Sequence, residues 1–159
     1  MENSQRYIGA DNGVLLCIDG RTDGGFAGRL YHRYEAGELS FLSIEQLAGL
    51  MESFFDRLGN PMPSTGDRDF IPQKPVYPKK KELMRMKTDE ELLQQHGNLG
   101  SFVVRVQHRQ NSSWQGQVTW LEQDRTVYFR SAWELMKLLD HAIPGSVETE
   151  WIPGEEKED

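Results

Sequence analysis

The sequence predicts an α+β fold made of two tandem βββα repeats, in which one helix covers one face of an antiparallel sheet in each repeat. Three observations support this: a self-alignment at an offset of 88 residues, the same order of strand and helix signals in both halves, and a serine helix cap in each half. The repeats are expected to be related by internal pseudo-symmetry, either sharing a core or joining one continuous sheet.

Sliding the sequence by 88 positions aligns residues 14–56 with 102–144 without a gap. Six of the 43 pairs are identical, and eight further pairs keep the residue class. The identical pairs are Arg21/Arg109, Gly28/Gly116, Phe41/Phe129, Ser43/Ser131, Leu47/Leu135 and Leu50/Leu138. Two unrelated β-to-α segments with similar turns are the alternative interpretation. Because apolar positions also match along the alignment, duplication is favoured.

Each half contains three runs that are typical of β-strands, rich in β-branched and aromatic residues and separated by turn residues. The runs are VLLCI, FAGRLYHRY and ELSF in the first half, and FVVRV, WQGQVTWLE and TVYF in the second. The turn-rich stretches RTDGGF (21–26) and RQNSSW (109–114) predict a hairpin after the first strand of each half.

A helix is predicted to follow the third strand of each half. Ser43 with Gln46, and Ser131 with Glu134, match the S-x-x-E/Q capping box, in which the serine oxygen accepts from an N–H of the first turn. Apolar residues then recur at helical spacing in both segments. Pro144 and Gly145 are expected to end the second helix.

The repeats are expected to form one compact domain, because a unit of about 43 residues buries little apolar surface alone. The expected organisation is repeat 1 at 12–56, a proline-rich basic linker at 57–99, repeat 2 at 100–143 and an acidic tail at 144–159. Within the linker, Thr88 and Glu91 predict a capped short helix near 88–96.

Composition restricts the possible partners. The 159 residues carry a net charge of −7 and have a mean hydropathy of −0.65, which argues against a general nucleic-acid or membrane binder. No run approaches the roughly 20 apolar residues of a membrane span. The chain has one cysteine, Cys17, and we expect a cytoplasmic protein. Its oligomeric state is left open.

No motif in the sequence indicates catalysis, a cofactor or a metal site, so we expect none of these. The histidines lack metal-ligand spacing, and the glycine-rich TDGGFAG (22–28) lacks the spacing of a phosphate-binding loop. Strand alternation places Cys17 and His32 on opposite faces of the sheet, which argues against a nucleophile and base pair. An enzyme with no recognisable motif stays open as a third functional class.

The sheet face away from the helices is the candidate binding surface. Strand alternation gives this face Arg, Gln and Tyr side chains, which recognition surfaces use as forked donors, amide pairs and amphipathic rings. The residues expected there are Arg29, Tyr31, Arg33, Arg105, Gln107, Arg109, Gln117 and Tyr128. An ordinary solvated sheet face would select the same residue types, and is the alternative interpretation.

Trp114 and Trp120 lie in one strand-like stretch, SWQGQVTW. The offset pairs Trp114 with Phe26, which predicts a buried core residue. Trp120 pairs with His32 and lies near the end of its strand, so its burial is left open, and it is kept as a candidate binding residue. We therefore expect one buried anchor rather than a platform of two tryptophans.

These observations favour a non-catalytic protein-binding or adaptor module. A binder of nucleic acid or another anionic ligand through the Arg/Gln/Tyr face is the alternative. The segments NSSWQG (111–116) and FRSAWEL (129–135) resemble a conserved segment of hypothetical proteins of gram-positive bacteria, and VLLCIDG and GRLYHRY also look like that group. The resemblance implies a bacterial origin and brings no activity with it.

Overall fold

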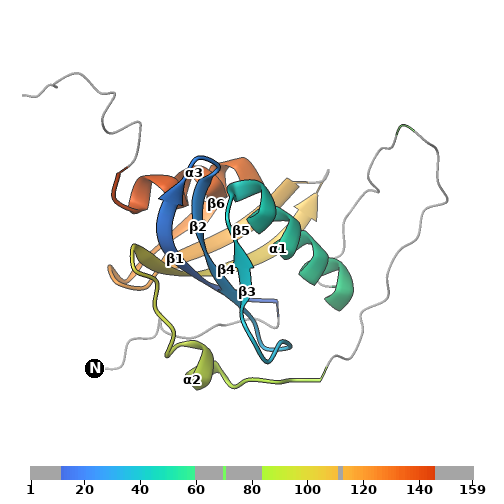
Figure 1. Ribbon diagram of the computed structural model, residues 1–159. Coiled ribbons are helices and arrows are strands. Elements are labelled where there is room, and N and C mark those ends of the chain that lie inside the picture. Colours follow the sequence, from blue (N-terminus) through green and yellow to red (C-terminus); the bar gives the residue numbers. More distant parts are fainter. Residues whose placement is uncertain (1–11, 60–69, 71–83, 111–112, 146–159) are drawn as a thin grey trace, which may run out of the picture.

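The computed structural model describes residues 12–59, 70, 84–110 and 113–145, and Figure 1 shows the arrangement of their elements. The α+β class predicted from the sequence is confirmed. The first half contains β1 (Val14–Thr22), β2 (Gly25–Tyr31), β3 (Leu39–Phe41) and α1 (Ile44–Leu58). The second half contains β4 (Gly100–Gln110), β5 (Ser113–Trp120), β6 (Arg125–Phe129) and α3 (Ala132–Ala142). The short helix α2 (Asp89–Leu92) lies between the halves in the sequence.

The six strands described form one antiparallel sheet with the order β3-β2-β1-β4-β5-β6. The first strand of each half is therefore central, and the third strand of each half lies at an edge. Antiparallel pairing between β1 and β4 joins the two halves, so they share a sheet rather than forming one each. The sheet is strongly twisted, and in Figure 1 the strands β1 and β2 cross in front of the strands of the second half.

The strand registers of the two halves match at the offset of 88 residues. Ile18 lies opposite Gly28 between β1 and β2, and Val106 lies opposite Gly116 between β4 and β5. An irregularity of the β-bulge kind follows directly in both pairs, two residues further along the first strand. A bulge adds one residue to a strand and shifts the alternation of side chains beyond it.

Gly28 and Gly116 are required by the backbone of the neighbouring strand. A Cβ atom at Gly28 would lie 2.0 Å from the carbonyl oxygen of Cys17, and one at Gly116 would lie 1.9 Å from that of Arg105. The adjacent strand therefore excludes any side chain at these two positions.

Both long helices begin at the predicted serines. The Ser43 hydroxyl oxygen accepts from the Gln46 N–H at 3.1 Å, and that of Ser131 accepts from the Glu134 N–H at 3.0 Å. The Gln46 and Glu134 side chains each accept from the N–H of the residue before the cap, at 2.7 Å in both helices. This return bond lies one residue earlier than in the predicted capping box, and it still satisfies a backbone donor near the helix start.

Helices α1 and α3 pack on the same face of the sheet, over one hydrophobic cluster that includes residues of both halves. Because side chains alternate along a strand, Leu16, Phe26 and Val104 point to this face, where they meet Leu47 of α1 and Leu135 of α3. Within the described residues, no helix is both long and apolar enough to cross a membrane.

The opposite face of the sheet carries a smaller hydrophobic cluster, which includes Leu15, Cys17 and Val103 and is covered by Leu92 of α2. Helix α2 is shorter than the predicted 88–96, although the Thr88 cap and its return bond from Glu91 are present. Most of the proline-rich part of the linker and almost all of the acidic tail lie outside the described residues.

Candidate functional site

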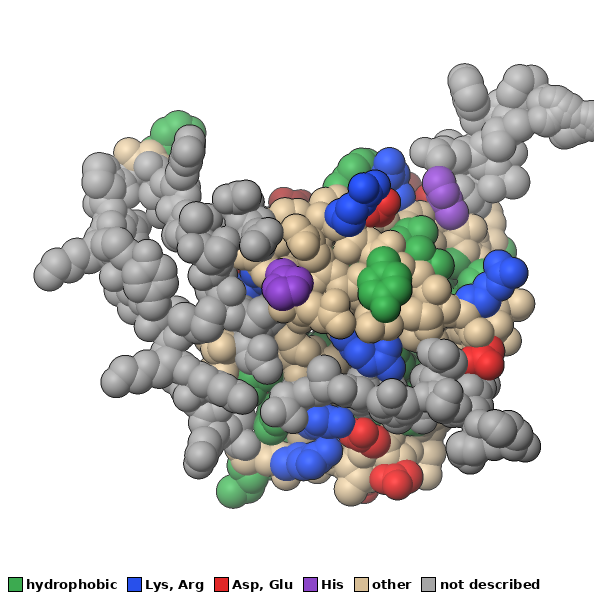
Figure 2. All heavy atoms as spheres, turned by 180° about the vertical axis from the view of Figure 1, so that it is seen from behind, with side chains coloured by type: hydrophobic (Ala, Val, Ile, Leu, Met, Phe, Trp, Pro, Cys, Tyr) green, Lys and Arg blue, Asp and Glu red, His purple; other side chains and the backbone are tan. Residues whose placement is uncertain are grey.

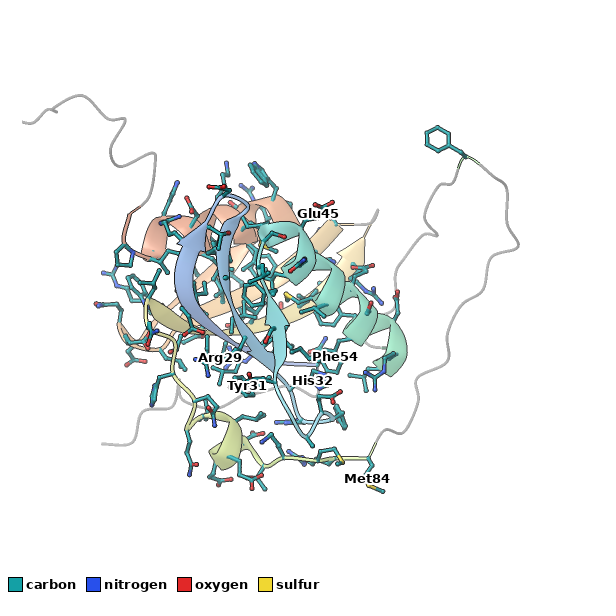
Figure 3. The ribbon with its side chains drawn as sticks, viewed as in Figure 1. Arg29, Tyr31, His32, Glu45, Phe54 and Met84 are labelled. Carbon is teal, nitrogen blue, oxygen red and sulfur yellow. The ribbon has the colours of Figure 1, made fainter. Side chains whose placement is uncertain are left out.

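Arg29 and Tyr31, two predicted binding residues of the first half, contact a neighbouring segment of the same chain. The Arg29 guanidinium donates to both carboxylate oxygens of Asp19, at 2.9 and 3.1 Å, and to the carbonyl of His96 at 2.6 Å. It also donates to the Tyr31 hydroxyl at 2.8 Å. Figure 3 shows these two side chains next to each other below the sheet.

The carboxylate of Asp19 anchors this cluster. Burial raises its pKa, but hydrogen bonds from the Arg29 guanidinium and from the Asn98 N–H outweigh that effect and hold the pKa below its usual value. Asp19 is therefore ionised at neutral pH. Its charge is matched within the protein, which reduces the attraction of Arg29 for an external anion.

Arg33, the third predicted residue of this half, binds the same segment. Its guanidinium donates to both oxygens of Asp89, at 2.8 and 2.9 Å, and its carbonyl accepts from the N–H groups of Met86 and Lys87, at 2.6 and 3.1 Å. The three residues of the first half thus hold residues 84–99 against the sheet. Sequence reasoning expected them on an open face, because it could not place the linker.

In the second half, β4, β5 and β6 place three predicted residues in a row across the sheet. Arg105 lies opposite Gln117, and Gln117 lies opposite Tyr128. Tyr128 is 70% exposed and Gln117 is half-buried, whereas Arg105 is buried and donates to the Thr119 hydroxyl at 3.3 Å. Gln107, further along β4, is exposed.

Arg109 lies on the helix side of the sheet, opposite to the predicted face. Its guanidinium donates to Glu52 at 3.0 Å and to Asp56 at 2.9 Å, both on α1, and lies over the Phe55 ring. The bulge after Val106 shifts the side-chain alternation in β4, so counting by twos from the start of the strand placed Arg109 on the wrong face.

Figure 2 shows the molecule from behind, with basic and acidic side chains interspersed among hydrophobic and polar ones on the described surface. No large area of one charge sign stands out among the described residues seen from that side. Nucleic-acid binders usually present a basic patch or stripe. The charge pattern of this view therefore does not favour that class of partner.

Trp114 is the buried anchor predicted from the sequence, with 4% of its surface exposed. Its ring meets the Phe55 ring edge to face, and its indole N–H donates to Glu52 at 2.8 Å. Trp120 lies on the same face but is only half-buried, stacked on Phe102 with the ring centroids 5.9 Å apart. The indole N–H of Trp120 is buried without a hydrogen-bond partner among the described residues.

A cavity of about 240 Å³ lies between α3 and strands β4, β5 and β6. Its walls include Phe102 and Trp120 from the sheet, Val127 from β6, and Leu138 and Ala142 from α3. The lining is mainly apolar. Arg125 and His141 are the only polar side chains of the lining. A small apolar pocket of this kind is a common form of ligand or side-chain binding site.

The corresponding place in the first half is filled. The offset of 88 residues pairs Trp120 with His32 and Ala142 with Phe54. The Phe54 ring is 2% exposed and stacks on the His32 ring, with centroids 3.8 Å apart and planes 14° apart. Figure 3 labels the two side chains next to each other. A phenyl ring from α1 thus occupies the position that α3 leaves open.

His32 is fully buried in this filled site. Burial, and secondly the positive charge of Arg57, lower its pKa to about 4. The imidazole is therefore neutral at physiological pH, where it acts as an aromatic partner of Phe54.

The pocket lies beside an exposed sheet edge. Strand β6 is the last strand of the sheet, and its outer side pairs with no described strand. Val127 and Tyr128 of β6 are 45% and 70% exposed, and Val127 also lines the pocket. Among the predicted site residues, Trp120 and Tyr128 therefore flank this region, whereas Arg29, Tyr31, Arg33 and Arg109 lie elsewhere.

Sequence reasoning missed the pocket, although one signal for it was present. The self-alignment sets the small Ala142 opposite the large Phe54, at a helix position that faces the core in both halves. A large-to-small difference at equivalent buried positions indicates missing volume.

Comparison of the chain with protein-family models, with curated proteins and with solved structures finds no match in any of the three. The site must therefore be interpreted from its own geometry. Within the described part of the chain, no group of three or more His, Cys, Asp and Glu side chains is placed to hold a metal ion.

Proposed function

We propose that this protein is a non-catalytic protein-binding module, which receives an extended segment of a partner along the edge strand β6. The observation that carries the proposal is the apolar pocket directly beside this edge. An edge strand presents unpaired backbone N–H and C=O groups, to which an incoming strand adds by hydrogen bonding. A pocket next to it selects the side chain that the incoming strand presents.

The exposed residues of β6 support this mode of binding. Val127 faces the pocket and Tyr128 faces the other side of the sheet, because side chains alternate along a strand. Both are large and well exposed, in a protein whose other large apolar strand residues are mostly buried. An added strand would cover both of them. Exposed aromatic and apolar residues of this kind are enriched at the centre of protein interfaces.

The alternative, an anionic ligand on the polar face, has less support. Arg29 and Arg33 pair with Asp19 and Asp89, and Arg109 pairs with acids of α1 on the opposite side of the sheet. A ligand would have to compete with these intramolecular carboxylates. The row of Arg105, Gln117 and Tyr128 is the part of the predicted face that this binding mode would still use.

We also propose that the two halves are tandem βββα repeats related by pseudo-two-fold symmetry. The matched registers support duplication, and so does the sheet centre, where Leu15 of β1 lies opposite Val103 of β4, its own counterpart at the offset of 88. The cross-contacts are reciprocal too: Arg21 pairs with α3, and Arg109 pairs with α1. On this view the pocket arose when the two copies diverged.

The binding proposal is tested by selecting short random peptides from a display library on the full chain. Bound peptides should shift NMR signals of β6 and α3, and Val127→Glu should abolish binding because it places a charge at the edge and in the pocket wall. Leu42→Glu, at an exposed leucine of the first half, is the matched control. Failure to select any peptide, or shifts confined to Gln107 and Gln117, would overturn the proposal.

A further inference from the structure

We infer that the pocket takes an aromatic side chain of the partner segment, with its ring packed against Trp120 as the Phe54 ring packs against His32. This inference rests on the proposed function, because it specifies which residue of an extended segment on β6 enters the pocket. The Phe54 ring in the first half then serves as the template for the ring that would occupy the open pocket of the second half.

The template is close because the surrounding strands agree residue by residue. β2 and β3 pair in the same register as β5 and β6, with Gly28 opposite Phe41 and Gly116 opposite Phe129. The wall residues Val118 and Leu138 correspond to Leu30 and Leu50, which pack in the core of the first half. A ring in the second pocket would therefore meet aliphatic walls at these two positions, as Phe54 does in the first half.

The size and chemistry of the cavity suit one aromatic ring. Its volume is about 240 Å³, and an engineered apolar cavity of about 150 Å³ in another protein holds benzene. A mainly apolar lining offers little compensation for the lost hydration of a buried polar group. The indole of Trp120 provides a flat wall, and aromatic pairs gain more than their buried area alone supplies.

The charged side chain of the lining, Arg125, indicates the character of the flanking residues. Arg125 lies at the start of β6 and is exposed. Its guanidinium favours a carboxylate next to the aromatic residue. The occupant to which the structure points is therefore an extended, acidic segment of a partner protein that carries a phenylalanine, tyrosine or tryptophan.

The test uses N-acetyl-phenylalaninamide as the probe and N-acetyl-leucinamide as its aliphatic match, each titrated into the full chain and followed by NMR. The phenyl probe should shift the Trp120 indole N–H and the Ala142 methyl signal. It should bind roughly twofold to tenfold more tightly than the leucine probe, which is the fold-change expected for an aromatic pair. Equal affinity of the two probes would overturn the aromatic assignment.

Two variants at equivalent positions make the test specific. Ala142→Phe gives the second half the side chain that fills the first, and should weaken the phenyl probe by roughly tenfold or more. Phe54→Ala opens the first half and should add a second site for the same probe, reported by His32. If Phe54→Ala does not fold, the Ala142→Phe variant alone decides the test. Undiminished binding of the phenyl probe to Ala142→Phe would overturn the inference.

The chain itself carries an aromatic residue flanked by acids, Trp151, outside the described residues. If Trp151→Ala increases the affinity for the phenyl probe, the chain's own segment fills the pocket and the inference of a partner's side chain is overturned. The inference fails separately from the proposed function: selected peptides that bind at β6 without an aromatic residue contradict only the inference. Probe binding without any selected peptide contradicts the proposed function and leaves only the preference of the pocket for an aromatic ring.

Discussion

The two halves of this protein share a register and a helix position but differ in how they complete their cores. In the first half, α1 supplies Phe54, which stacks on His32 and is almost fully buried. In the second half, α3 has Ala142 at the equivalent position, and a cavity of about 240 Å³ remains beside Trp120. The first half thus supplies its own aromatic ring at this position, and under our proposal the second half receives one from a partner.

The two helices also differ in length. α1 continues to Leu58 and buries Phe54, Phe55 and Leu58, whereas α3 ends at Ala142. The edge strand of the filled half has three residues, and that of the open half has five. The half with the pocket therefore also has the longer edge for an added strand. Pocket and edge vary together, which is what a binding site built from both would require.

The largest effect is expected from Phe54→Ala, which opens the filled half. Removing a buried phenyl ring costs about 3–5 kcal/mol, through lost burial and the cavity left behind. Denaturant unfolding measures this change in the free energy of unfolding. Leu138→Ala, a smaller change beside a cavity that already exists, is the comparison and should cost less. Equal costs would contradict the difference in packing between the halves.

We expect His32 to make the free energy of unfolding depend on pH. The tryptophan at the equivalent position of the second half does not titrate and has no such effect. The pKa of His32 is lowered to about 4 in the folded protein, so between pH 6.5 and 4 the unfolded chain binds more protons. Stability should therefore fall as the pH is lowered through this window, by on the order of 3 kcal/mol at most. Unfolding curves at several pH values measure the slope.

The matched variants for this effect are His32→Phe and His108→Asn. His32→Phe removes the titrating group and should flatten the slope, whereas His108→Asn changes an exposed histidine and should leave the slope as in the wild-type protein. A slope that persists in His32→Phe would show that carboxylates elsewhere produce it.

The smallest effect is expected at the two tryptophans of β5, Trp114 and Trp120. Trp114→Phe removes the hydrogen bond from the indole N–H to Glu52 and should cost about 1–2 kcal/mol. Trp120→Phe removes an N–H that has no partner among the described residues, so its cost should stay within about 0.5 kcal/mol. Thermal unfolding of the two variants compares them directly, and the reverse order would contradict the described geometry.

Local signals were predicted from the sequence more accurately than tertiary placement. The helix starts at Ser43 and Ser131 were correct, because capping depends on residues within one turn. The face of Arg109 was wrong, because a bulge in β4 leaves no clear mark in the sequence. The exposure of Arg29 and Arg33 was overestimated, since it depends on where residues 84–99 fold back.

The pocket could be predicted from the sequence only in part. Its position follows from a difference between two aligned residues, Phe54 and Ala142, and both were visible in the sequence. That the difference leaves a cavity, rather than being filled by a neighbour, depends on the packing of Trp120, Val127 and Leu138 around it. Sequence periodicity reports which side chains face the core, but not how completely they fill it.

The most direct test of the account is the shift in the thermal midpoint that N-acetyl-phenylalaninamide produces in the wild-type protein and in Ala142→Phe. A ligand that binds only the folded state raises the midpoint in proportion to its occupancy. We expect the probe to raise the midpoint of the wild-type protein and to leave that of Ala142→Phe unchanged, with the variant at least as stable as the wild type in the absence of probe. The same shift in both proteins would contradict the claim that the pocket of the second half binds an aromatic ring at the position that Phe54 fills in the first half.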